Sequence, residues 1–331
     1  MRPEVSVILP VRNGGPFLQE AVDSILGQTL GELELLVVDD HSSDGAPQAL
    51  EVSDPRCRIV PATGRGVARA FNCGFERAAA PWIARMDADD IALPQRLELQ
   101  LDYLRRHPDI DIAGGRVELF AAEPLRGGNR HYQRWLNSLR HPEAIRRALF
   151  IESPVPNPTA LFRRASLERL GGYRDGEWPE DYDLYLRADR LGMRMGKPAE
   201  TVLRWRDHSS RLTRSDARYG RRRFQQAKAH FLVHGRLPDQ PIIIWGAGPT
   251  GRTMHDLLVA EGASVEGFIE VHPRRVGGVK RGKPVWSPAA AAEPHGCMVL
   301  VAVGARGARA EIRAFLERHR RREGSDFLFV A

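Results

Sequence analysis

The sequence contains few cysteines and no long apolar run. Its three cysteines, Cys57, Cys73 and Cys297, are scattered through 331 residues, which favours reduced thiols over a disulfide framework or a cysteine zinc site. The longest apolar stretches, such as PIIIWGAG and CMVLVAVGA, are far shorter than the roughly 20 residues that span a bilayer. The first residues, MRPEVSVILP, lack the long apolar region of a signal peptide. We therefore expect a cytoplasmic protein.

Acidic residues are fewer than basic ones, and the net charge is +7. Two arginine runs, at 221–223 and 318–322, could attract nucleic acid, anionic lipid or nucleotide. A solvated helix face is the simpler explanation of such runs. No aromatic-interleaved basic stripe or known nucleic-acid module is present, so nucleic-acid partners are not expected. Peripheral contact with the inner face of a membrane, and homo-oligomerisation, stay open.

The length of the chain indicates about two domains, and the pattern of its first part is of the α/β type. Short β-rich runs alternate there with segments whose apolar residues recur at helical spacing. The expected strands are 5–10, 33–40, 58–60, 82–87 and 110–115, and the expected helices are 17–28, 66–80 and 94–107. This alternation is typical of a mostly parallel sheet with helices on both faces.

Polar side chains fall at the carboxyl ends of the expected strands. Arg12 and Asn13 follow the first strand, Asp39 and Asp40 end the second, and Asp87 ends the fourth. Ligands of open α/β sheets bind at this edge. The sequence therefore directs these side chains toward a common crevice.

The segment ARMDADDIALPQRL places three carboxylates, Asp87, Asp89 and Asp90, within four positions. Carboxylate oxygens suit a hard divalent cation such as Mg²⁺ or Mn²⁺, which would in turn neutralise a diphosphate. The alternative is a helix-capping turn, in which Asp89 or Asp90 caps the helix that Pro94 helps to start.

Three segments together resemble the family 2 glycosyltransferases of the GT-A fold, which use nucleotide-sugars. They are SVILPVRNGGPFLQEAVDSILGQTLGELELLVVDDHSSDG, GVARAFNCGFERAAAPWIARMDADDIALPQRLELQ and GGYRDGEWPEDYDLYLRADRLG. The resemblance covers about 5–214 in the expected order. It implies a GT-A glycosyltransferase domain over residues 1–214, a nucleotide diphosphate-sugar donor, Mn²⁺ or Mg²⁺, and inversion at the anomeric carbon.

The resemblance also implies roles for residues on the donor side. Pro10, Val11 and Arg12 would border the nucleobase, with Arg12 stacked on it. Asp40 would accept a hydrogen bond from the base, with Asp39 as its support. The metal ligands would be Asp89, Asp87 and His208, where Asp87 also holds the ribose or orients the site and His208 could instead touch the diphosphate. The donor phosphates or sugar would contact Arg69, Arg85, Arg206 and Arg211, although Arg69 could equally be a surface residue of a helix.

On the acceptor side, the resemblance assigns the catalytic base to Asp181 in WPEDYDLYLR, with Glu180 beside it. An inverting transfer needs a carboxylate that takes the proton of the acceptor hydroxyl. Stabilisation of a helix N-terminus is the alternative role of these carboxylates. Asn157 stands where relatives frequently have histidine, and it could hydrogen-bond a sugar hydroxyl.

Two absences narrow the implied activity. The chain has no Q-x-x-R-W segment of processive polymer synthases, because Arg204 and Trp205 follow Thr201 where a glutamine would be needed. It has no candidate transmembrane helix to extrude a polymer. We expect a transferase that adds one sugar to a glycan or lipid-linked acceptor, in the assembly of a surface glycan or glycolipid.

The composition changes after a basic helical linker at 215–240. Residues 241–331 contain a buried strand that runs into G-x-G-x-x-G, formed by Gly246, Gly248 and Gly251, and a second strand that ends at Glu270. This spacing predicts a smaller Rossmann-like α/β accessory domain. The glycines and Glu270 form a candidate second nucleotide site, although glycines that serve only packing explain the motif equally well.

Two other functions stay open at this point. A noncatalytic nucleotide-sugar sensor would keep the fold, although the joint presence of Asp87, Asp89 and Asp181 argues against it. An oxidoreductase would need an acid or base beside a nicotinamide in the C-terminal domain, where His272 and His295 lie in proline-flanked loops after Glu270.

Overall fold

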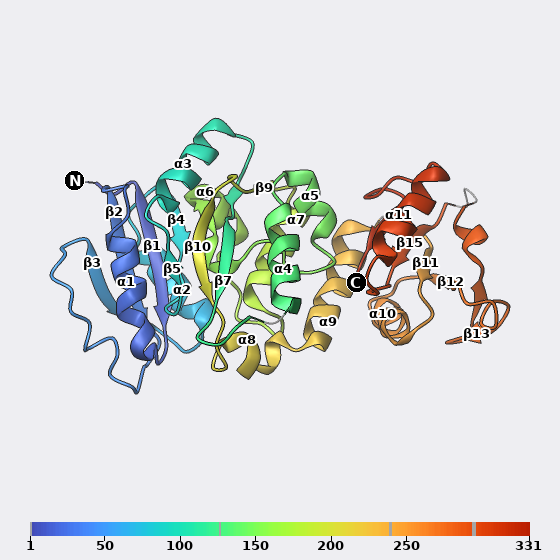
Figure 1. The fold of residues 1–331 in the computed structure, drawn as a ribbon, viewed down its shortest axis with the longest axis horizontal. Helices are drawn as coiled ribbons and strands as arrows, with labels where there is room; N and C mark the ends of the chain where they lie inside the picture. The colour runs from blue at the N-terminus through green and yellow to red at the C-terminus, as the bar shows by residue number, and fades with distance from the viewer. Residues whose placement is uncertain (1, 126, 238–239, 293–295) are drawn as a thin grey trace. The chain divides into compact units, whose positions relative to one another are not determined.

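The computed structural model describes residues 2–125, 127–237, 240–292 and 296–331 (Figure 1). Residues 238–239 of the expected linker, and His295, lie outside these ranges. The chain forms two compact units, one of Met1–Arg146 with Pro154–Arg218, and one of Arg147–Ser153 with Tyr219–Ala331. Within the described ranges, we find no helix with the length and apolarity needed to cross a membrane.

The first unit is built on a seven-stranded sheet. Its strand order is β3 (Cys57–Pro61), β2 (Leu33–Asp39), β1 (Val5–Val11), β4 (Trp82–Arg85), β8 (Leu161–Arg163), β6 (Ile112–Ala113) and β9 (Met195–Gly196). All neighbours pair in parallel except β8, which is antiparallel to both β4 and β6. The predicted α/β class with a mostly parallel sheet is therefore confirmed, and each strand expected before residue 116 is present with shifted ends.

A smaller three-stranded sheet completes the first unit. It consists of β5 (Ile91–Ala92), β10 (Thr201–Arg206) and β7 (Arg116–Phe120), with β10 in the middle. The β10 strand runs antiparallel to β5 and parallel to β7. This pairing brings the chain near residue 206 beside the segment that follows β4, although the two are more than a hundred residues apart in sequence.

Helices cover both faces of the large sheet. The first unit contains α1 (Leu18–Leu26), α2 (Val67–Arg77), α3 (Arg96–Arg106), α4 (Gly127–Ser138), α5 (Pro142–Ala148, whose last two residues belong to the second unit), α6 (Arg164–Leu170), α7 (Glu180–Arg190) and α8 (Leu212–Ser215) (Figure 1). Short 3₁₀ turns are η1 (Gly15–Phe17), η2 (Asn157–Thr159) and η3 (Ala217–Tyr219), whose last residue belongs to the second unit.

The β1 strand shows how this layering follows from the sequence. All of its residues are buried, and one alternate set, Val5, Val7, Leu9 and Val11, packs in one core with the buried face of α1. The other face meets α2, where a Cβ on Gly74 would lie 2.6 Å from Ile8 Cγ2. Burying each such aliphatic side chain stabilises the fold by about 1.5–3 kcal/mol.

The second unit contains its own six-stranded sheet. The order is β13 (Val279–Lys280), β14 (Lys283–Trp286), β12 (Val265–Ile269), β11 (Ile242–Trp245), β15 (Met298–Val301) and β16 (Phe327–Phe329), parallel from β14 to β16. Its helical elements are α9 (Arg221–Phe231), the π-helical turn η4 (Leu232–Arg236), α10 (Pro249–Ala260), η5 (Pro288–Ala291) and α11 (Ala308–Arg318). From β14 to β16 this is the strand order of doubly wound nucleotide-binding sheets.

Residues 219–237 of the basic segment that we expected as a linker belong to the second unit. Lys228 of α9 is buried, and its Nζ donates to the carbonyls of Ile151 and Val330 at 2.7 and 3.2 Å. Burial lowers the pKa of Lys228 to about 8. Apolar residues of the same helix, among them Ala227 and Phe231, are also buried, which a charge run read alone does not reveal.

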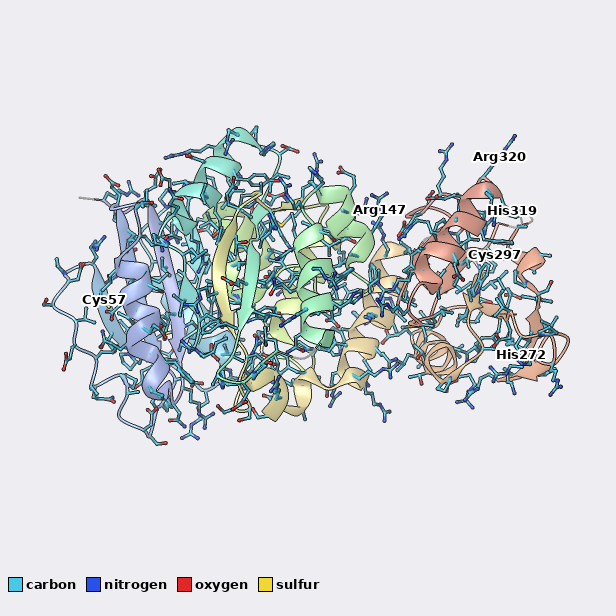
Figure 2. The ribbon with its side chains drawn as sticks, viewed as in Figure 1. Cys57, Arg147, His272, Cys297, His319 and Arg320 are labelled. Carbon is cyan, nitrogen blue, oxygen red and sulfur yellow. The ribbon has the colours of Figure 1, made fainter. Side chains whose placement is uncertain are left out.

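The cysteines are free thiols, as the scattered spacing suggests. Cys57 lies in β3, and Cys297 directly precedes β15 (Figure 2). Cys73 is buried in α2.

Candidate active site

The carboxylates of Asp87, Asp89 and Asp90 gather in the loop between β4 and β5. One oxygen from each lies within 4.8 Å of the others. Asp87 and Asp89 are partly exposed, whereas Asp90 is 1% exposed. The sheet thus holds three carboxyl groups at the carboxyl end of β4, where repulsion between their ionised forms favours a bound cation.

The buried carboxyl group of Asp90 has one hydrogen-bonded oxygen and one oxygen without a partner among the described residues. Its Oδ1 accepts the backbone N–H of Arg206 at 2.8 Å, whereas the buried Oδ2 has no hydrogen-bond partner in the described part of the chain. Burial, followed by the charges of Asp89 and Asp87, raises the pKa of Asp90 well above its ordinary value. A divalent cation would satisfy the oxygen and offset this repulsion, so the donor set fits Mg²⁺ or Mn²⁺.

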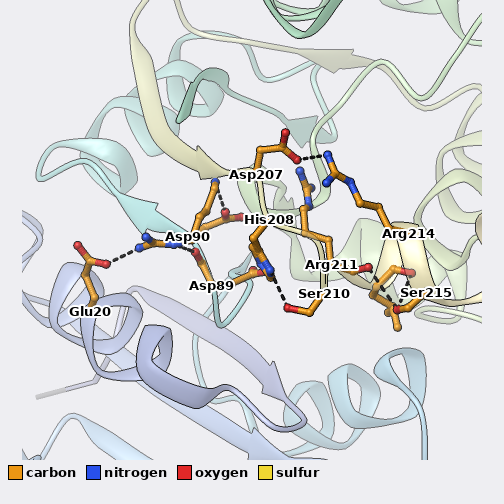
Figure 3. Close-up of polar contacts among 11 residues, drawn as sticks. Glu20, Asp89, Asp90, Asp207, His208, Ser210, Arg211, Arg214 and Ser215 are labelled. Atoms are coloured by element: carbon orange, nitrogen blue, oxygen red, sulfur yellow. Dashed lines mark hydrogen bonds and ion pairs between the residues drawn. The ribbon is translucent and has the colours of Figure 1, made fainter. Parts of the chain in front are cut away.

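His208 lies at this cluster, as the sequence prediction requires of a metal ligand. Its Nε2 is 2.8 Å from Asp89 Oδ2 and its Nδ1 is 2.9 Å from Ser210 Oγ (Figure 3). The ring also packs on Phe17, with centroids 5.2 Å apart. The two polar contacts fix the orientation of the imidazole beside the carboxylates.

Arg206 braces the carboxylate loop. Its Nε donates to the backbone oxygen of Asp89 at 2.7 Å, and its guanidinium forms an ion pair with Glu20 of α1 (Figure 3). The same group lies over the rings of Phe17 and Phe120, 4.4 and 4.5 Å from their centroids. In this structure Arg206 is therefore engaged in positioning the loop, whereas the sequence suggested a phosphate contact.

Arg85 is likewise engaged within the protein. It is 3% exposed, and its Nη2 lies 2.6 Å from Asp87 Oδ1. Burial alone would lower the pKa of the guanidinium, yet the pKa is raised because Asp87 lies beside it. Tyr173 and Glu180 act in the same direction. Arg85 thus orients Asp87 and connects the carboxylate loop electrostatically with α7.

The remaining arginines predicted at the donor lie elsewhere. Arg69 of α2 is exposed and pairs with Asp175 at 2.8 Å. Arg211 lies over the ring of Trp205, 4.5 Å from its centroid, and its charge lowers the pKa of Asp90. Among the described residues, neither side chain forms a hydrogen bond or an ion pair with the three carboxylates, so a donor contact for either stays a prediction.

The residues predicted for the nucleobase occupy the ends of β1 and β2. Pro10 and Val11 are buried in β1, and Arg12 is exposed directly after it. Asp39 Oδ1 accepts the backbone N–H of Ser42 at 2.9 Å, which shapes the following turn. These positions agree with the crevice expected at the strand ends.

Asp40 is the second buried carboxylate with a vacant acceptor. It is 4% exposed, and its Oδ2 accepts the backbone N–H of Gly66 at 2.9 Å. Its Oδ1 has no partner within residues 2–125, 127–237, 240–292 and 296–331. A buried carboxylate oxygen is costly to leave unpaired, so a donor group from a ligand, such as a base N–H, fits this atom.

The predicted acceptor side is formed at the start of α7. Glu180 is its first residue and is buried, whereas Asp181 is partly exposed. Asn157 connects this helix with its surroundings, since its Nδ2 donates to Glu180 Oε1 at 3.5 Å and its Oδ1 accepts from Tyr173 Oη at 2.5 Å. Asn157 therefore acts at least partly by holding Glu180 and Tyr173.

Asp183, also in the first turn of α7, forms a buried ion pair with Arg187. Its Oδ2 lies 2.7 Å from Arg187 Nε, and both side chains are buried. Arg187 also donates to the carbonyls of Leu170 and Gly172. This network ties α7 to the end of α6, so Asp183 has a structural role.

Sequence reasoning missed two buried groups behind the site. Arg96 of α3 is fully buried, and its Nη2 donates to the Arg85 carbonyl at 2.6 Å. Burial lowers the pKa of Arg96 to about 10, and its Nε donates to Gln100 at 3.2 Å. Tyr173, described above, is also buried. The sequence signal for buried Arg96 was its position four residues before Gln100, on the apolar face of the predicted helix.

In the second unit, two of the three glycines have packing reasons. Gly246 has φ +116°, and a Cβ on Gly251 would lie 1.8 Å from the Gly246 carbonyl oxygen. Glu270 is engaged by its own loop, since it accepts the backbone N–H of Val271 and pairs with Arg275 at 3.3 Å. The structure places Glu270 directly after β12, and the second nucleotide site stays a prediction.

Solved structures with a similar fold are found among glycosyltransferases. The structure of S. aureus TarS 1–349 in complex with UDP-GlcNAc is similar to this chain, with a TM-score of 0.56 at 16% identity. The similarity covers 77% of this chain and 71% of the TarS chain. A mannosyltransferase from Pyrobaculum calidifontis, solved with GDP-Man and Mn²⁺, covers 70% of this chain and 63% of its own, with a TM-score of 0.50 at 23% identity. The fold is that of the GT-A glycosyltransferases.

The sequence relationship makes this assignment specific. The model of glycosyl transferase family 2 matches residues 6–171, and the chain belongs to this family. The putative glycosyltransferase EpsE of Bacillus subtilis is 30% identical over 225 residues, which is 66% of this chain and 78% of EpsE. The O-antigen biosynthesis glycosyltransferase WbnJ of Escherichia coli is 27% identical over 223 residues, 65% of this chain and 84% of WbnJ.

Proposed function

We propose that this glycosyltransferase moves one sugar from a nucleotide diphosphate-sugar to an acceptor hydroxyl, with inversion at the anomeric carbon and dependence on Mn²⁺ or Mg²⁺. The observation that carries the proposal is the carboxylate cluster of Asp87, Asp89 and Asp90, with an orphaned buried oxygen on Asp90 and His208 held against Asp89. Hard oxygen ligands at the carboxyl edge of a parallel sheet suit a metal-bound diphosphate.

The metal would be held by Asp89, Asp87 and His208, with Asp90 close enough to contribute. A divalent cation in such a site neutralises the charge of a diphosphate leaving group. On the base side, Asp40 Oδ1 would accept an N–H from the nucleobase, and Arg12 would stack on its face. These contacts bind and orient the donor, so the sugar would lie between the carboxylate loop and the start of α7.

Asp181 is the proposed base. It is partly exposed at the first turn of α7, where its Oδ1 accepts the backbone N–H of Tyr182 at 2.7 Å, whereas its neighbours Glu180 and Asp183 are buried. In the transfer, Asp181 takes the proton of the acceptor hydroxyl as the hydroxyl oxygen forms its bond to the anomeric carbon. The bond from that carbon to the diphosphate breaks on the opposite face, and the diphosphate leaves with the electron pair.

The acceptor class follows from the relatives. EpsE is described as a putative glycosyltransferase, and WbnJ as an enzyme of O-antigen biosynthesis. We infer that this chain also acts on a surface glycan or a lipid-linked precursor. Arginine-rich segments such as 221–223 and 318–322 would support peripheral contact with an anionic membrane that presents such an acceptor.

A panel of nucleotide-sugars tests the proposal. We expect release of the nucleoside diphosphate with at least one donor when Mn²⁺ or Mg²⁺ is present, and loss of release after chelation. NMR of the glycosylated product should show the anomeric configuration opposite to that of the donor. Tight donor binding without release or transfer for any acceptor tested would favour the sensor, and oxidation of a nicotinamide cofactor would favour the oxidoreductase.

A second nucleotide site in the C-terminal unit is favoured by one observation. Gly248 has ordinary extended geometry, φ −74° and ψ −175°, as the N-cap of α10, and nothing lies within 4 Å of a Cβ built on it. Neither strain nor packing therefore requires glycine at this position. Open space in front of a helix N-terminus is what a phosphate needs.

Gly248→Asp should remove nucleotide binding by this unit without loss of stability. The added carboxylate repels phosphate, whereas aspartate is a preferred N-cap residue and should leave the melting temperature unchanged or slightly higher. Calorimetry of the full chain with nucleoside diphosphates and nucleotide-sugars should give two sites for the wild type and one for the variant. Gly248→Ala adds the Cβ without the charge and should keep both sites. A wild-type chain with a single site at millimolar ligand would rule out a nucleotide site in this unit.

A further inference from the structure

Two histidines and a glutamate that take no part in the candidate active site meet in the second unit. His230 is near the end of α9, His234 is in the π-helical turn η4, and Glu261 follows the last residue of α10. Their candidate ligand atoms all lie within 4.8 Å of one another. No local spacing in the sequence connects these residues, because Glu261 is 27 positions from His234.

Both imidazole rings contact the same carboxylate oxygen of Glu261. His230 Nδ1 lies 3.1 Å and His234 Nε2 lies 2.8 Å from Glu261 Oε2. The two rings are 4.8 Å apart between centroids. Ligand atoms around a tetrahedral ion with bonds of about 2.0 Å are roughly 3.3 Å apart, so small side-chain movements would bring these three atoms to that spacing.

The backbone that supports the cluster is well anchored. Phe231, next to His230, and Lys228 one turn earlier are buried, and α9 packs against α10. The three polar side chains are themselves accessible, with exposed fractions of 33%, 44% and 30% for His230, His234 and Glu261. An ion can therefore enter from solvent, while the helices keep the ligands in place.

We propose that His230, His234 and Glu261 form a binding site for a divalent transition metal ion of the zinc type. Neutral imidazole nitrogens and one carboxylate are the ligand set that Zn²⁺ takes readily, with water in the remaining position. The ion would occupy the place of the hydrogen atoms now shared between the rings and Glu261. It would fasten η4 and the end of α9 to the end of α10.

This site differs in chemistry from the carboxylate cluster of the first unit. The three aspartates offer hard oxygen ligands, which suit Mg²⁺ and Mn²⁺, whereas two imidazoles favour a borderline ion. Zinc bound here would stabilise the second unit and would take no part in sugar transfer. A negative Zn²⁺ titration would therefore leave the proposed transferase activity untouched, and a negative transferase assay would leave the proposed zinc site untouched.

The untagged full-length chain, titrated with ZnCl₂ in millimolar Mg²⁺, tests the proposal. An Asp89→Asn background weakens zinc capture by the carboxylate cluster and His208, and it should still bind one Zn²⁺ per chain at the proposed site. The melting temperature should rise by about 3 °C or more with saturating Zn²⁺. Substitution by Co²⁺ should give the visible absorption bands of a four- or five-coordinate ion.

His234→Ala in the same background should weaken Zn²⁺ binding by about a hundredfold or more, because one of three protein ligands is lost. Glu261→Gln keeps the size of the side chain and should also weaken binding, which guards against a folding defect in the first variant. His319→Ala removes an exposed histidine at the end of α11 (Figure 2), and it should bind as its parent does. The proposal would be wrong if the Asp89→Asn chain bound no Zn²⁺ and showed no rise in melting temperature. It would also be wrong if His234→Ala and Glu261→Gln both kept the Zn²⁺ affinity of that chain.

Discussion

Asp181→Asn should lower turnover by roughly a hundredfold or more, the scale typical for loss of a general base, while donor affinity stays close to that of the wild type. The amide keeps the shape of the side chain and its position at the start of α7, but it cannot take a proton from the acceptor hydroxyl. Steady-state rates with saturating donor and acceptor measure the first quantity, and calorimetry with the donor measures the second.

Asp189→Asn is a matched control for this prediction, because it changes an aspartate near the other end of the same helix. It should leave turnover within a few-fold of the wild type. Near-normal turnover of Asp181→Asn would instead move the base to Glu180. Asp183 is not an alternative, since it forms a buried ion pair with Arg187.

Asp89→Asn should abolish metal-dependent donor binding and leave the fold intact. One charged ligand becomes neutral at nearly constant shape, and hard cations depend strongly on the charge of their ligands. Among the described residues, the partly exposed Asp89 carboxylate contacts His208 and accepts no backbone hydrogen bond, so its loss should change the melting temperature little. Donor titrations with and without Mn²⁺ measure the effect.

Asp109→Asn provides the comparison for this variant. It removes an exposed carboxylate that pairs with Arg194, so it changes the net charge of the chain by the same amount outside the site. Its donor affinity should match that of the wild type in Mn²⁺. Wild-type affinity of Asp89→Asn under the same conditions would exclude Asp89 as a metal ligand.

The central strands and helices of the first unit could be predicted from sequence because their signal is local. Strands β1 and β2 are continuous apolar runs, and α1, α2 and α3 each have one apolar face, so periodicity fixes them to within a few residues. The pairing of β10 between β5 and β7, and the reversed direction of β8, depend on contacts between distant segments. No local pattern encodes those contacts.

The candidate site likewise has a part that the sequence predicted and a part that depends on tertiary contacts. The carboxylate motif and His208 were identified as one metal site, and the structure brings Asp89 and His208 together across 119 positions. Arginines were harder to place, because a long cationic side chain takes whichever acceptor the tertiary structure offers. Arg85 faces Asp87, and Arg206 faces the Asp89 carbonyl. Direct ligand roles for these residues stay predictions.

The position of Arg206 limits how far the carboxylate loop can be treated as a portable motif. Its backbone N–H holds Asp90, its guanidinium holds the Asp89 carbonyl, and the rings of Phe17 and Phe120 enclose that guanidinium. The short segment MDADD thus owes its geometry to three distant parts of the chain. An engineer who grafted it onto another sheet would transfer the ligands without their supports, and a faithful graft would have to carry the end of β10 and both aromatic residues with it.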